Sequence, residues 1–342
     1  MASVEEIRPT TKGAKLGSTG VNVERLQNYL GRFGYFDSGV HADFGMRPVD
    51  VEPMPTQVGQ FDEQTERALC ELQRGAGIAV SGEIDEPTLA LLQMDRCGMP
   101  DHGEFVAQGN KWPNNDVKYG FHNFTGDLTQ AQIRAAVSTA LGYWAAVTPL
   151  TFAEAAVGTN PEIRIGFYSG NHGDGSPFDG PSGVLAHAFY PPPNGGDIAG
   201  DSHFDDAESW SVDLPPSGID LYTVAAHEFG HALGLAHSTV SDALMYPYYG
   251  GPHRFLDADD IAGIQSIYGV EQWQANKQVL RVFATYHSKN AWGFVQDVGW
   301  RKVKPTAPDG VTNVLGALCE SRANGKPVTV LTTATEIEQL YL

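Results

Sequence analysis

Residues 227–237 decide how this chain folds around its chemistry, and they read His227-Glu228-Phe229-Gly230-His231-Ala232-Leu233-Gly234-Leu235-Ala236-His237. On a helix, His227 and His231 are four residues apart, so both imidazoles leave one face and can bind the same zinc ion. Gly234 tolerates a positive φ and lets the chain turn back, which brings His237 in as a third ligand. Glu228 can then accept a proton from a water at the fourth position, whose pKa zinc lowers to about 7. Because five fixed positions rarely match by chance, we predict a catalytic zinc site rather than histidines scattered on a helix surface.

A methionine follows the histidine motif at an informative distance. Met245 lies in the stretch Ala243-Leu244-Met245-Tyr246-Pro247. A methionine alone is more often an ordinary core residue. Zinc peptidases with the long histidine motif, however, require a methionine turn downstream of the third histidine. We therefore predict that turn at Met245.

The composition limits the partners of the chain. Its 342 residues suggest two or three domains, and 42% apolar residues suffice for proper cores. The net charge of −19 argues against nucleic acid or an anionic membrane surface as the main partner. Residues 105–270 carry 5 basic and 18 acidic side chains, a balance of −13 that suits calcium. The sequence holds no apolar run of about 18 residues, so no membrane span is expected.

The cysteines and the first residues leave the compartment open. Three cysteines cannot make a disulfide framework, and Cys70 and Cys319 are expected to be core thiols rather than redox sensors. Residues 1–9 lack the apolar core of a signal peptide. A removed leader, another export route and an intracellular location all remain possible readings, although the enzyme class predicted below favours an extracellular one.

Residues 1–104 are expected to form a small helical domain. Apolar residues recur at helical spacing in three stretches between residues 13 and 94. Asp62 is placed to cap the second helix, and Asp85 opens the third with Pro87 behind it. An irregular loop rich in proline and aspartate is expected from about 39 to 57. The inward-facing residues are predicted to be Val23, Leu26, Tyr29, Leu30, Phe33, Thr65, Ala68, Leu69, Leu72, Leu89 and Leu92.

Two further domains are expected downstream. In residues 105–270, strands are predicted at 117–121, 163–167 and 184–189, and helices at 129–147, 221–233 and 257–268, with Asp220 capping the middle helix. This order indicates an α/β (α+β) fold with the histidine helix laid across a sheet. Residues 271–342 contain short β-rich runs at 279–286, 292–295, 300–303, 328–332 and 339–342. They predict a small, mostly β accessory domain, to which no chemistry can be assigned.

With the histidine motif and the methionine turn in place, residues 13–270 resemble the matrixins, the matrix metalloproteinase family of metzincin zinc endopeptidases. The N-terminal pattern of Leu-Gln, Gly-Tyr-Phe, Gly-Gln-Phe-Asp and Ala-Leu pieces resembles the three-helix peptidoglycan-binding-like domain, which often forms the pro-segment of such proteases. By itself that domain could anchor the protein to a cell wall. Its place directly before a protease favours the pro-segment. The resemblance does not extend to residues 271–342.

The resemblance implies a latent form. The stretch Asp95-Arg96-Cys97-Gly98-Met99-Pro100-Asp101 is similar to the matrixin cysteine switch. There the thiolate fills the open position of the catalytic zinc and displaces the water, and an arginine–aspartate pair, here Arg96 and Asp101, holds the loop. The alternative is a buried structural cysteine. Asp95 stands where the family has proline, a change that could alter how rigidly the loop is held.

The resemblance also implies further ions. A structural zinc is expected on His172, Asp174, His187 and His203, a set that can close a tetrahedral site. A calcium ion is expected on carboxylates and backbone carbonyls of Asp179, Gly180, Ser182, Val184, Asp205 and Glu208. Asp201 is a candidate ligand for a second calcium ion. Solvated loop acids are the plainer alternative for the calcium set.

An acidic pair follows near the end of the domain. By resemblance, one of Asp259 and Asp260 braces the methionine turn, and the other receives the new N-terminus after the pro-segment is removed. Equally, both could be first-turn acids that complement a helix dipole.

These features predict a zinc-dependent endopeptidase in which Glu228 is the general base and Cys97 blocks the zinc in the zymogen. Family likeness places Val224, Tyr246 and Pro247 in the walls of the specificity pocket and Thr223 near its base, which leaves room for an apolar side chain. The expected partners are protein or peptide substrates, with peptidoglycan or a matrix polymer as a further candidate. A monomer is expected. A peptidoglycan-associated enzyme or anchor is the alternative, and a non-catalytic relic is disfavoured by the intact Glu228.

Overall fold

Helix α7 (Leu221–Ala232) carries the first two histidines of the motif and begins where the sequence predicts. The Asp220 side chain caps it, accepting hydrogen bonds from the Thr223 amide at 3.2 Å and the Thr223 hydroxyl at 2.6 Å. The helix ends before Gly234, which has a φ of 106°, a value that side chains other than glycine rarely tolerate. The predicted turn out of the helix is therefore confirmed.

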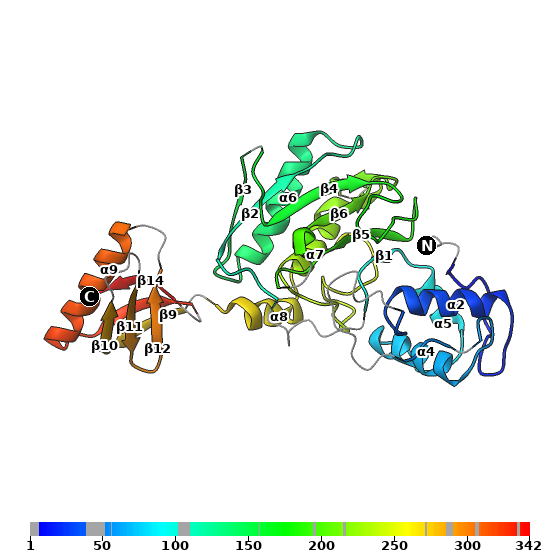
Figure 1. Ribbon diagram of the computed structural model, residues 1–342, viewed down its shortest axis with the longest axis horizontal. Helices are drawn as coiled ribbons and strands as arrows, with labels where there is room; N and C mark the ends of the chain where they lie inside the picture. The colour runs from blue at the N-terminus through cyan, green and yellow to red at the C-terminus, as the bar shows by residue number, and fades with distance from the viewer. Residues whose placement is uncertain are drawn as a thin grey trace. The chain divides into compact units, whose positions relative to one another are not determined.

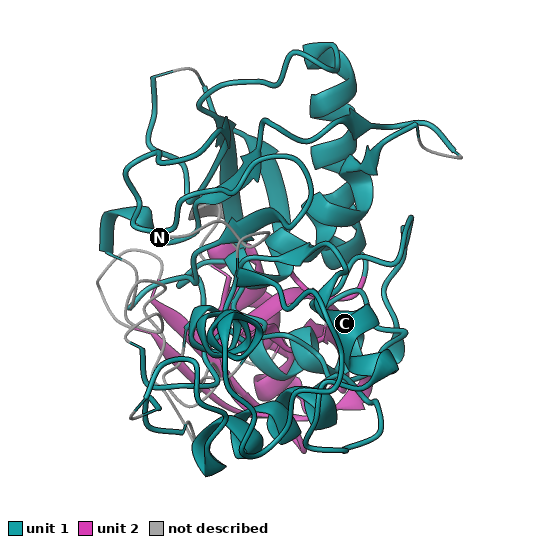
Figure 2. Ribbon diagram, turned by 90° about the vertical axis from the view of Figure 1, so that its right-hand side faces the viewer, with its two compact units in different colours: residues 1–146, 150–267 teal, residues 147–149, 268–342 magenta. Residues whose placement is uncertain are grey.

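The chain forms two units in this computed structural model, residues 1–146 with 150–267 and residues 147–149 with 268–342 (Figure 2). The structure describes residues 7–38, 52–55, 57–101, 110–156, 158–193, 196–214, 217–270, 272–284, 290–304, 308–333 and 336–342. Most of the predicted loop at 39–57 and of the segment between Asp101 and Lys111 lies outside them. Within the described residues, no helix is long and apolar enough to cross a bilayer.

A six-stranded sheet supports α7 (Figure 1). Its strand order is β1-β5-β6-β4-β2-β3. The pair β5–β6 is antiparallel, and the other four neighbouring pairs are parallel. The strands are β1 (Arg96–Cys97), β2 (Asp116–Phe121), β3 (Thr151–Glu154), β4 (Ile163–Tyr168), β5 (Val184–Ala188) and β6 (Ser202–Asp205). Strand β1 comes from the predicted cysteine switch, so this stretch extends the sheet of residues 105–270 at the β5 edge.

Helix α6 (Gln130–Ala145) packs against α7 and begins in a capping box formed by Thr129 and Gln132. Trp144 at its far end is fully buried and donates its indole N–H to the Ala226 carbonyl at 3.0 Å. The remaining elements of this region are η1 (Gly196–Ile198), β7 (Trp210–Ser211), β8 (Ile219–Asp220) and α8 (Ala258–Tyr268). The predicted α/β order with the histidine helix against a sheet is confirmed.

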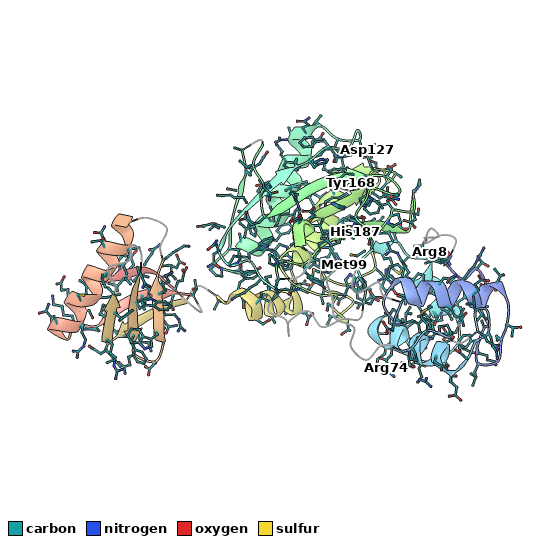
Figure 3. All side chains as sticks on the ribbon, viewed as in Figure 1. Arg8, Arg74, Met99, Asp127, Tyr168 and His187 are labelled. Carbon is teal, nitrogen blue, oxygen red and sulfur yellow. The ribbon has the colours of Figure 1, made fainter. Side chains whose placement is uncertain are left out.

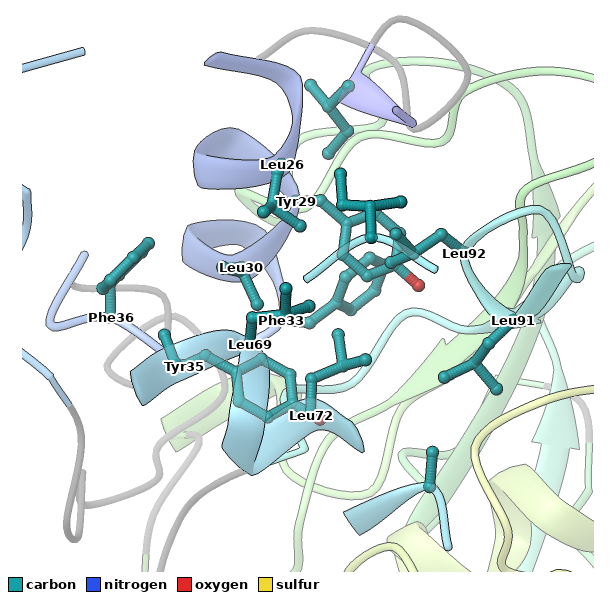
Figure 4. Packing of buried hydrophobic residues seen from close by; sticks show 14 of the residues in the cluster. Leu26, Tyr29, Leu30, Phe33, Tyr35, Phe36, Leu69, Leu72, Leu91 and Leu92 are labelled. Atoms are coloured by element: carbon teal, nitrogen blue, oxygen red, sulfur yellow. The ribbon is translucent and has the colours of Figure 1, made fainter. Parts of the chain in front are cut away.

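The N-terminal helices are α2 (Val21–Arg32), α4 (Glu63–Gly75) and α5 (Glu86–Leu92). Asp62 and Asp85 cap α4 and α5 as predicted, accepting from the Thr65 and Thr88 amides. The core between the helices contains Leu26, Leu30, Leu69, Leu72 and Leu92 (Figure 4). The same cluster includes Val184 and Tyr248 from residues 105–270, so the helical domain shares buried apolar surface with the domain that carries α7.

The second unit contains a six-stranded sheet of order β10-β11-β12-β14-β13-β9 and one helix among its described residues. The strands are β9 (Gln272–Lys277), β10 (Val279–Ala284), β11 (Ala291–Val295), β12 (Gly299–Val303), β13 (Val328–Thr332) and β14 (Glu336–Tyr341). The mostly β character is as predicted, but the 17-residue helix α9 (Pro308–Asn324) was not expected. Its Leu318 packs into the core of the sheet.

One prediction about the cysteines is wrong. Cys319 is exposed and Cys70 is only partly buried, so neither is the core thiol that burial statistics favour. Cys319 lies on α9, whose buried face is formed by other residues, including Leu318 and Ser321. The helical arrangement of this segment, which the sequence reading missed, accounts for the error.

Candidate metal centres and cleft

Four buried or half-buried side chains converge at the end of α7. One ligand atom from each of His227, His231, His237 and Cys97 can be chosen so that all four lie within 4.8 Å of one another. The Nε2 atoms of His227 and His231 are 3.1 Å apart, and the Cys97 sulfur is 3.5 Å from His231 Nε2. The structure thus brings together all four residues that the sequence assigns to the catalytic zinc.

Hydrogen bonds fix which imidazole nitrogen faces this cluster. His227 donates Nδ1–H to the Leu244 carbonyl at 2.8 Å, and His231 donates Nδ1–H to the Leu235 carbonyl at 2.7 Å. Both Nε2 atoms therefore carry lone pairs and face each other at 3.1 Å. Burial lowers the pKa of His227 to about 3 and lowers that of His231 as well, which keeps both rings neutral. Two facing lone pairs in a dry site repel, so this donor set fits a soft divalent cation such as zinc.

His237 completes the set from the turn after α7. Its Nδ1 lies 2.9 Å from Asp101 Oδ1, and its buried Nε2 has no hydrogen-bond partner among the described residues. A buried nitrogen without a partner is costly unless a ligand satisfies it. The orphaned nitrogen is a further sign that a cation belongs here.

Glu228 lies beside the cluster with 1% of its surface exposed. Neither carboxylate oxygen has a hydrogen-bond partner of ordinary geometry among the described residues. Burial raises the pKa of Glu228 to about 8. A divalent cation nearby would favour the charged carboxylate and lower that pKa. Such a group can both accept and return a proton near neutral pH.

The methionine turn passes directly beneath α7. A Cβ added at Gly230 would meet the Met245 sulfur at 2.3 Å, so only glycine allows this approach. Asp260 accepts hydrogen bonds from the amides of Leu244 at 2.8 Å and Met245 at 3.0 Å. Of the two acids left open by the sequence, Asp260 thus braces the turn. Asp259 accepts from the Ser238 hydroxyl at 2.6 Å.

The stretch predicted to be the cysteine switch is held by backbone hydrogen bonds on both sides. Cys97 donates its amide to the Pro247 carbonyl at 2.9 Å, and Gly98 donates to the Ala186 carbonyl at 2.8 Å. Met99 (labelled in Figure 3) is fully buried and packs with Cys97, Phe189 and Tyr190. Burial, and after it the negative charge of Glu228, raises the pKa of the Cys97 thiol. A bound zinc ion reverses this preference, because a coordinating thiol is deprotonated.

Arg96 and Asp101 form the ion pair that the resemblance implies. Arg96 Nη2 lies 2.5 Å from Asp101 Oδ1, and the guanidinium is fully buried. It lies 3.5 Å over the Phe33 ring and donates to the hydroxyls of Tyr29 at 3.1 Å and Tyr248 at 3.3 Å. A buried charge this well surrounded is satisfied. The aromatic cage joins helix α2 to the switch.

A second donor cluster combines His172 and Asp174, in the loop between β4 and β5, with His187 on β5 and His203 on β6. Asp174 Oδ2 is 2.7 Å from His172 Nε2, 2.7 Å from His187 Nε2 and 2.8 Å from His203 Nδ1. His172 donates Nδ1–H to the Gly170 carbonyl at 2.9 Å, so in the neutral ring its Nε2 points a lone pair at the carboxylate. A cation between these donors removes that conflict. The closed set of three imidazoles and one carboxylate fits a tetrahedral structural zinc.

The acids assigned to calcium surround the next turn. Asp205 accepts from the Gly180 amide at 3.2 Å, and Asp179 accepts from the Val184 amide at 3.0 Å. Glu208 is 7% exposed, and its Oε1 has no hydrogen-bond partner among the described residues. Burial raises the pKa of Asp205 to about 6 and that of Glu208 to about 7. Crowded, buried carboxylates of this kind fit a hard cation such as calcium, and Ser182, with a φ of 65°, lies in the same turn.

Asp201 has a partner already. Its Oδ1 lies 2.6 Å from Arg164 Nε, and its Oδ2 is 3.9 Å from His203 Nε2. A guanidinium therefore satisfies the carboxylate that a second calcium ion would need. The second calcium stays a prediction.

A cleft of about 1020 Å³ opens beside α7. Thr223, Val224, Tyr246 and Pro247, the residues predicted for the specificity pocket, all line it, together with His227 and Glu228. Ala76, Leu91 and Cys97 of the helical domain line it too, and Tyr246 donates its hydroxyl to the Ala76 carbonyl at 3.0 Å. The helical domain thus lies against this cleft.

Some functional contacts were not predicted. Tyr29 and Phe33 were assigned only to the helical core, and Gly230 was given no role. Tyr35, whose hydroxyl donates to Asp101 Oδ2 at 2.8 Å, was not singled out. The aromatic residues on and just after α2 were the sequence signal for these contacts. Their pairing with Arg96 and Asp101 is long-range and becomes visible only in the folded structure.

Comparison with known proteins agrees with this geometry. Residues 111–269 match the matrixin family model, and residues 19–92 match that of a putative peptidoglycan binding domain. The hatching enzyme of Paracentrotus lividus is 43% identical over 251 residues, which cover 72% of this chain and 39% of that protein. The interstitial collagenase of Equus caballus is 45% identical over 62% of this chain and 46% of its own length. The neutrophil collagenase of Homo sapiens is 38% identical over 76% of this chain and 53% of its own length. The chain spans about half or less of the length of these relatives.

Proposed function

Because this chain belongs to the matrixin family through residues 111–269, we propose that it is a zinc-dependent endopeptidase made as a zymogen. The observation that carries the proposal is the convergence of three imidazoles beside the buried carboxylate of Glu228, with His227 and Glu228 in the lining of a cleft. The names of the relatives, two collagenases and a hatching enzyme, agree with a hydrolase that acts on proteins. An extracellular place of action and a monomeric state are part of the same proposal.

The chemistry divides between the ion and the chain. A zinc ion bound by His227, His231 and His237 supplies Lewis acidity and lowers the pKa of a bound water to about 7. Glu228 accepts a proton from the attacking water as its oxygen bonds to the scissile carbonyl carbon. Glu228 then returns that proton to the amine nitrogen as the C–N bond breaks. No bond between substrate and protein forms at any step.

Removal of the Glu228 carboxylate tests this assignment. Glu228→Gln keeps the size of the side chain but cannot accept the proton, so kcat should fall by at least about 10²–10⁴-fold. The measurement is hydrolysis of a fluorogenic peptide by activated wild-type and variant protein. Zinc content, determined by mass spectrometry, should be equal in both. A variant that holds zinc and cleaves at the wild-type rate would refute the role of Glu228.

The lining of the cleft supports a preference for apolar side chains after the scissile bond. Val224 and Pro247 offer apolar walls, and the small Thr223 leaves depth. A library of peptides varied at that position should be cleaved fastest where leucine, methionine or a similar side chain follows the bond. Preference for a charged side chain would contradict this assignment.

Latency is proposed to rest on Cys97. The sulfur lies 3.5 Å from His231 Nε2, within the cluster of metal ligands, and its loop is bonded to Pro247 and Ala186 on either side. The thiolate excludes the water that Glu228 would activate. The site at His172, Asp174, His187 and His203 is proposed to hold a structural zinc, and the site at Asp179, Asp205 and Glu208 is proposed to hold calcium. Both ions would help to order the loop between β4 and β5.

A second reading comes from the family match of residues 19–92. A peptidoglycan-binding module would retain the chain on a cell wall. The aromatic cage around Arg96 and the Tyr246–Ala76 hydrogen bond support a pro-segment instead. Sedimentation of the full-length Glu228→Gln protein with insoluble peptidoglycan separates the two: the pro-segment reading expects no retention.

A further inference from the structure

Asp95 stands where similar switch sequences have proline, and its carboxylate has a defined partner. Asp95 Oδ1 accepts a hydrogen bond from the Gly183 amide at 2.9 Å, and the Asp95 carbonyl accepts from the Tyr249 amide at 2.8 Å. The next residue, Arg96, donates its amide to the Gly183 carbonyl at 2.8 Å. Both polar groups of Gly183 are therefore engaged by the pro-segment. A proline in place of Asp95 could not supply the side-chain bond.

Gly183 belongs to the turn that carries the calcium candidates. The following amide, that of Val184, donates to Asp179 Oδ1 at 3.0 Å. Gly183 has a φ of 106°, and a Cβ there would meet Asp179 Oδ2 at 2.1 Å. Consecutive amides of this turn thus bond to one carboxylate of the pro-segment and one carboxylate of the protease domain. The peptide unit between Gly183 and Val184 links the two parts, because its carbonyl accepts from Arg96 of the switch and its amide donates to Asp179 of the turn.

The charge of Asp95 adds to that of the loop. Asp95, Asp205 and Asp179 all raise the pKa of Glu208 through their negative charge, after burial as the main cause. Glu208 is buried and its Oε1 lacks a partner among the described residues. Arg8, labelled in Figure 3, lies 3.9 Å from Asp95 and offsets part of its charge. Without a cation, docking the switch therefore adds a negative charge beside three others.

We propose that Asp95 couples cation binding in the 179–208 loop to latency, so that calcium holds the pro-segment closed and the closed pro-segment holds calcium more tightly. The proposal rests on the proposed function only in taking that loop to bind calcium. A bound cation attracts the docked Asp95 carboxylate. By thermodynamic linkage, cation binding favours docking of the pro-segment by the same factor by which docking favours cation binding. Asp95 is a positioning residue and takes no part in peptide hydrolysis.

The reactivity of the Cys97 thiol reports how often the switch opens. Cys97 is buried, so a thiol reagent reaches it only when the pro-segment leaves the cleft. The full-length chain with Glu228→Gln prevents autocleavage and is labelled at constant free zinc, with and without saturating calcium. Peptide mapping separates Cys97 from Cys70 and Cys319, whose labelling serves as an internal standard. In the parent protein, calcium should slow the labelling of Cys97 at least about fivefold, the lower range for coupled sites.

Asp95→Asn is the deciding variant, because it keeps the oxygen that accepts from Gly183 and removes the charge. The half-buried position, with 27% of the side chain exposed, tolerates this isosteric change. Calcium should then slow Cys97 labelling less than about twofold, well below the usual range for coupled sites. Glu86→Gln, a change at an exposed pro-segment acid that pairs with Lys12, is the control and should behave as the parent. Equal slowing in the parent and in Asp95→Asn would overturn the proposal, and so would no slowing in the parent.

Calorimetry supplies an independent readout. The calcium Kd of the parent should be tighter than that of Asp95→Asn by the same factor that separates their labelling. Equal Kd values, or no heat of calcium binding in either protein, would overturn the inference. Failure of the proposed function would look different: the activated wild-type chain would not cleave peptides, while the calcium dependence of Cys97 labelling would be unaffected.

Discussion

At the scale of single residues, Gly98 shows how closely the switch is fitted to the sheet. A Cβ added at Gly98 would meet a Val184 methyl carbon at 2.7 Å and His187 Cβ at 3.3 Å. Gly98→Ala should therefore push the switch away from β5 and expose Cys97. We expect Cys97 to be labelled about tenfold faster, equal to about 1.4 kcal/mol of lost docking.

Gly142→Ala is the matched control, because a Cβ at that helical glycine meets nothing within 4 Å. It should leave the labelling rate unchanged. Unchanged labelling of Gly98→Ala would mean that β5 yields to the added methyl and that the close fit does not hold the switch.

The residues that could be predicted are those whose roles follow from local spacing. The three histidines, Glu228 and the positive φ of Gly234 all belong to one helix and its turn, so the motif alone places them. The aromatic cage of Arg96 could not be foreseen, because Tyr29 and Tyr248 are separated from it by 67 and 152 positions in the chain. The Asp95–Gly183 bond is likewise long-range, across 88 positions.

At the scale of elements, the start of α7 depends on Asp220. This fully buried carboxylate caps the helix through Thr223 and forms an ion pair with Arg254 Nη2 at 2.5 Å. Asp220→Ala removes a cap, usually about 0.5–2 kcal/mol, and leaves Arg254 without this partner. We expect the protein to lose about 2–4 kcal/mol of unfolding free energy, measured by urea denaturation of the zinc-loaded, full-length chain with Glu228→Gln.

Asp259→Ala serves as the comparison, since Asp259 is an exposed first-turn acid bonded to Ser238. Its loss should be below about 1 kcal/mol. If the two substitutions cost the same, Asp220 does not anchor the helix in the way its contacts indicate.

Helices with a capping residue and elements with a regular spacing of apolar residues were predicted. Very short strands, and a helix rich in residues of low helix propensity, were not. Thr129, Asp220, Asp62 and Asp85 mark helix starts by local chemistry that needs no fold. Strands β3 and β6, each of 4 residues, are too short for alternation to show. Helix α9 contains glycine, threonine and valine, which have low helix propensity, so its sequence resembled the strands around it.

At the scale of the whole molecule, several described contacts that need no metal tie the helical domain to the protease domain. Among them, Tyr246 bonds to Ala76, Arg96 in its aromatic cage bonds to Tyr248, and Asp95 bonds to Gly183. The connection from Cys97 to the cluster of imidazoles, by contrast, is proposed to depend on a metal. Latency is therefore expected to be shared between the thiolate and the protein–protein contacts, and loss of one should weaken the other.

A thiol-reactive mercurial tests that arrangement in the full-length chain. Capture of the Cys97 sulfur frees the position beside Glu228, so the protein should cut itself in the segment between Asp101 and Lys111, which joins the two domains. Time-resolved mass spectrometry should show a first product beginning in that segment. The Cys97→Ser variant should mature without the mercurial, since a hydroxyl is a far weaker zinc ligand than a thiolate. The Glu228→Gln chain should remain intact under every condition, and its cleavage would trace the activity to a contaminating protease. Stable, uncut wild-type protein after full mercuration of Cys97 would mean that the docked helices, rather than the thiolate, keep the enzyme latent.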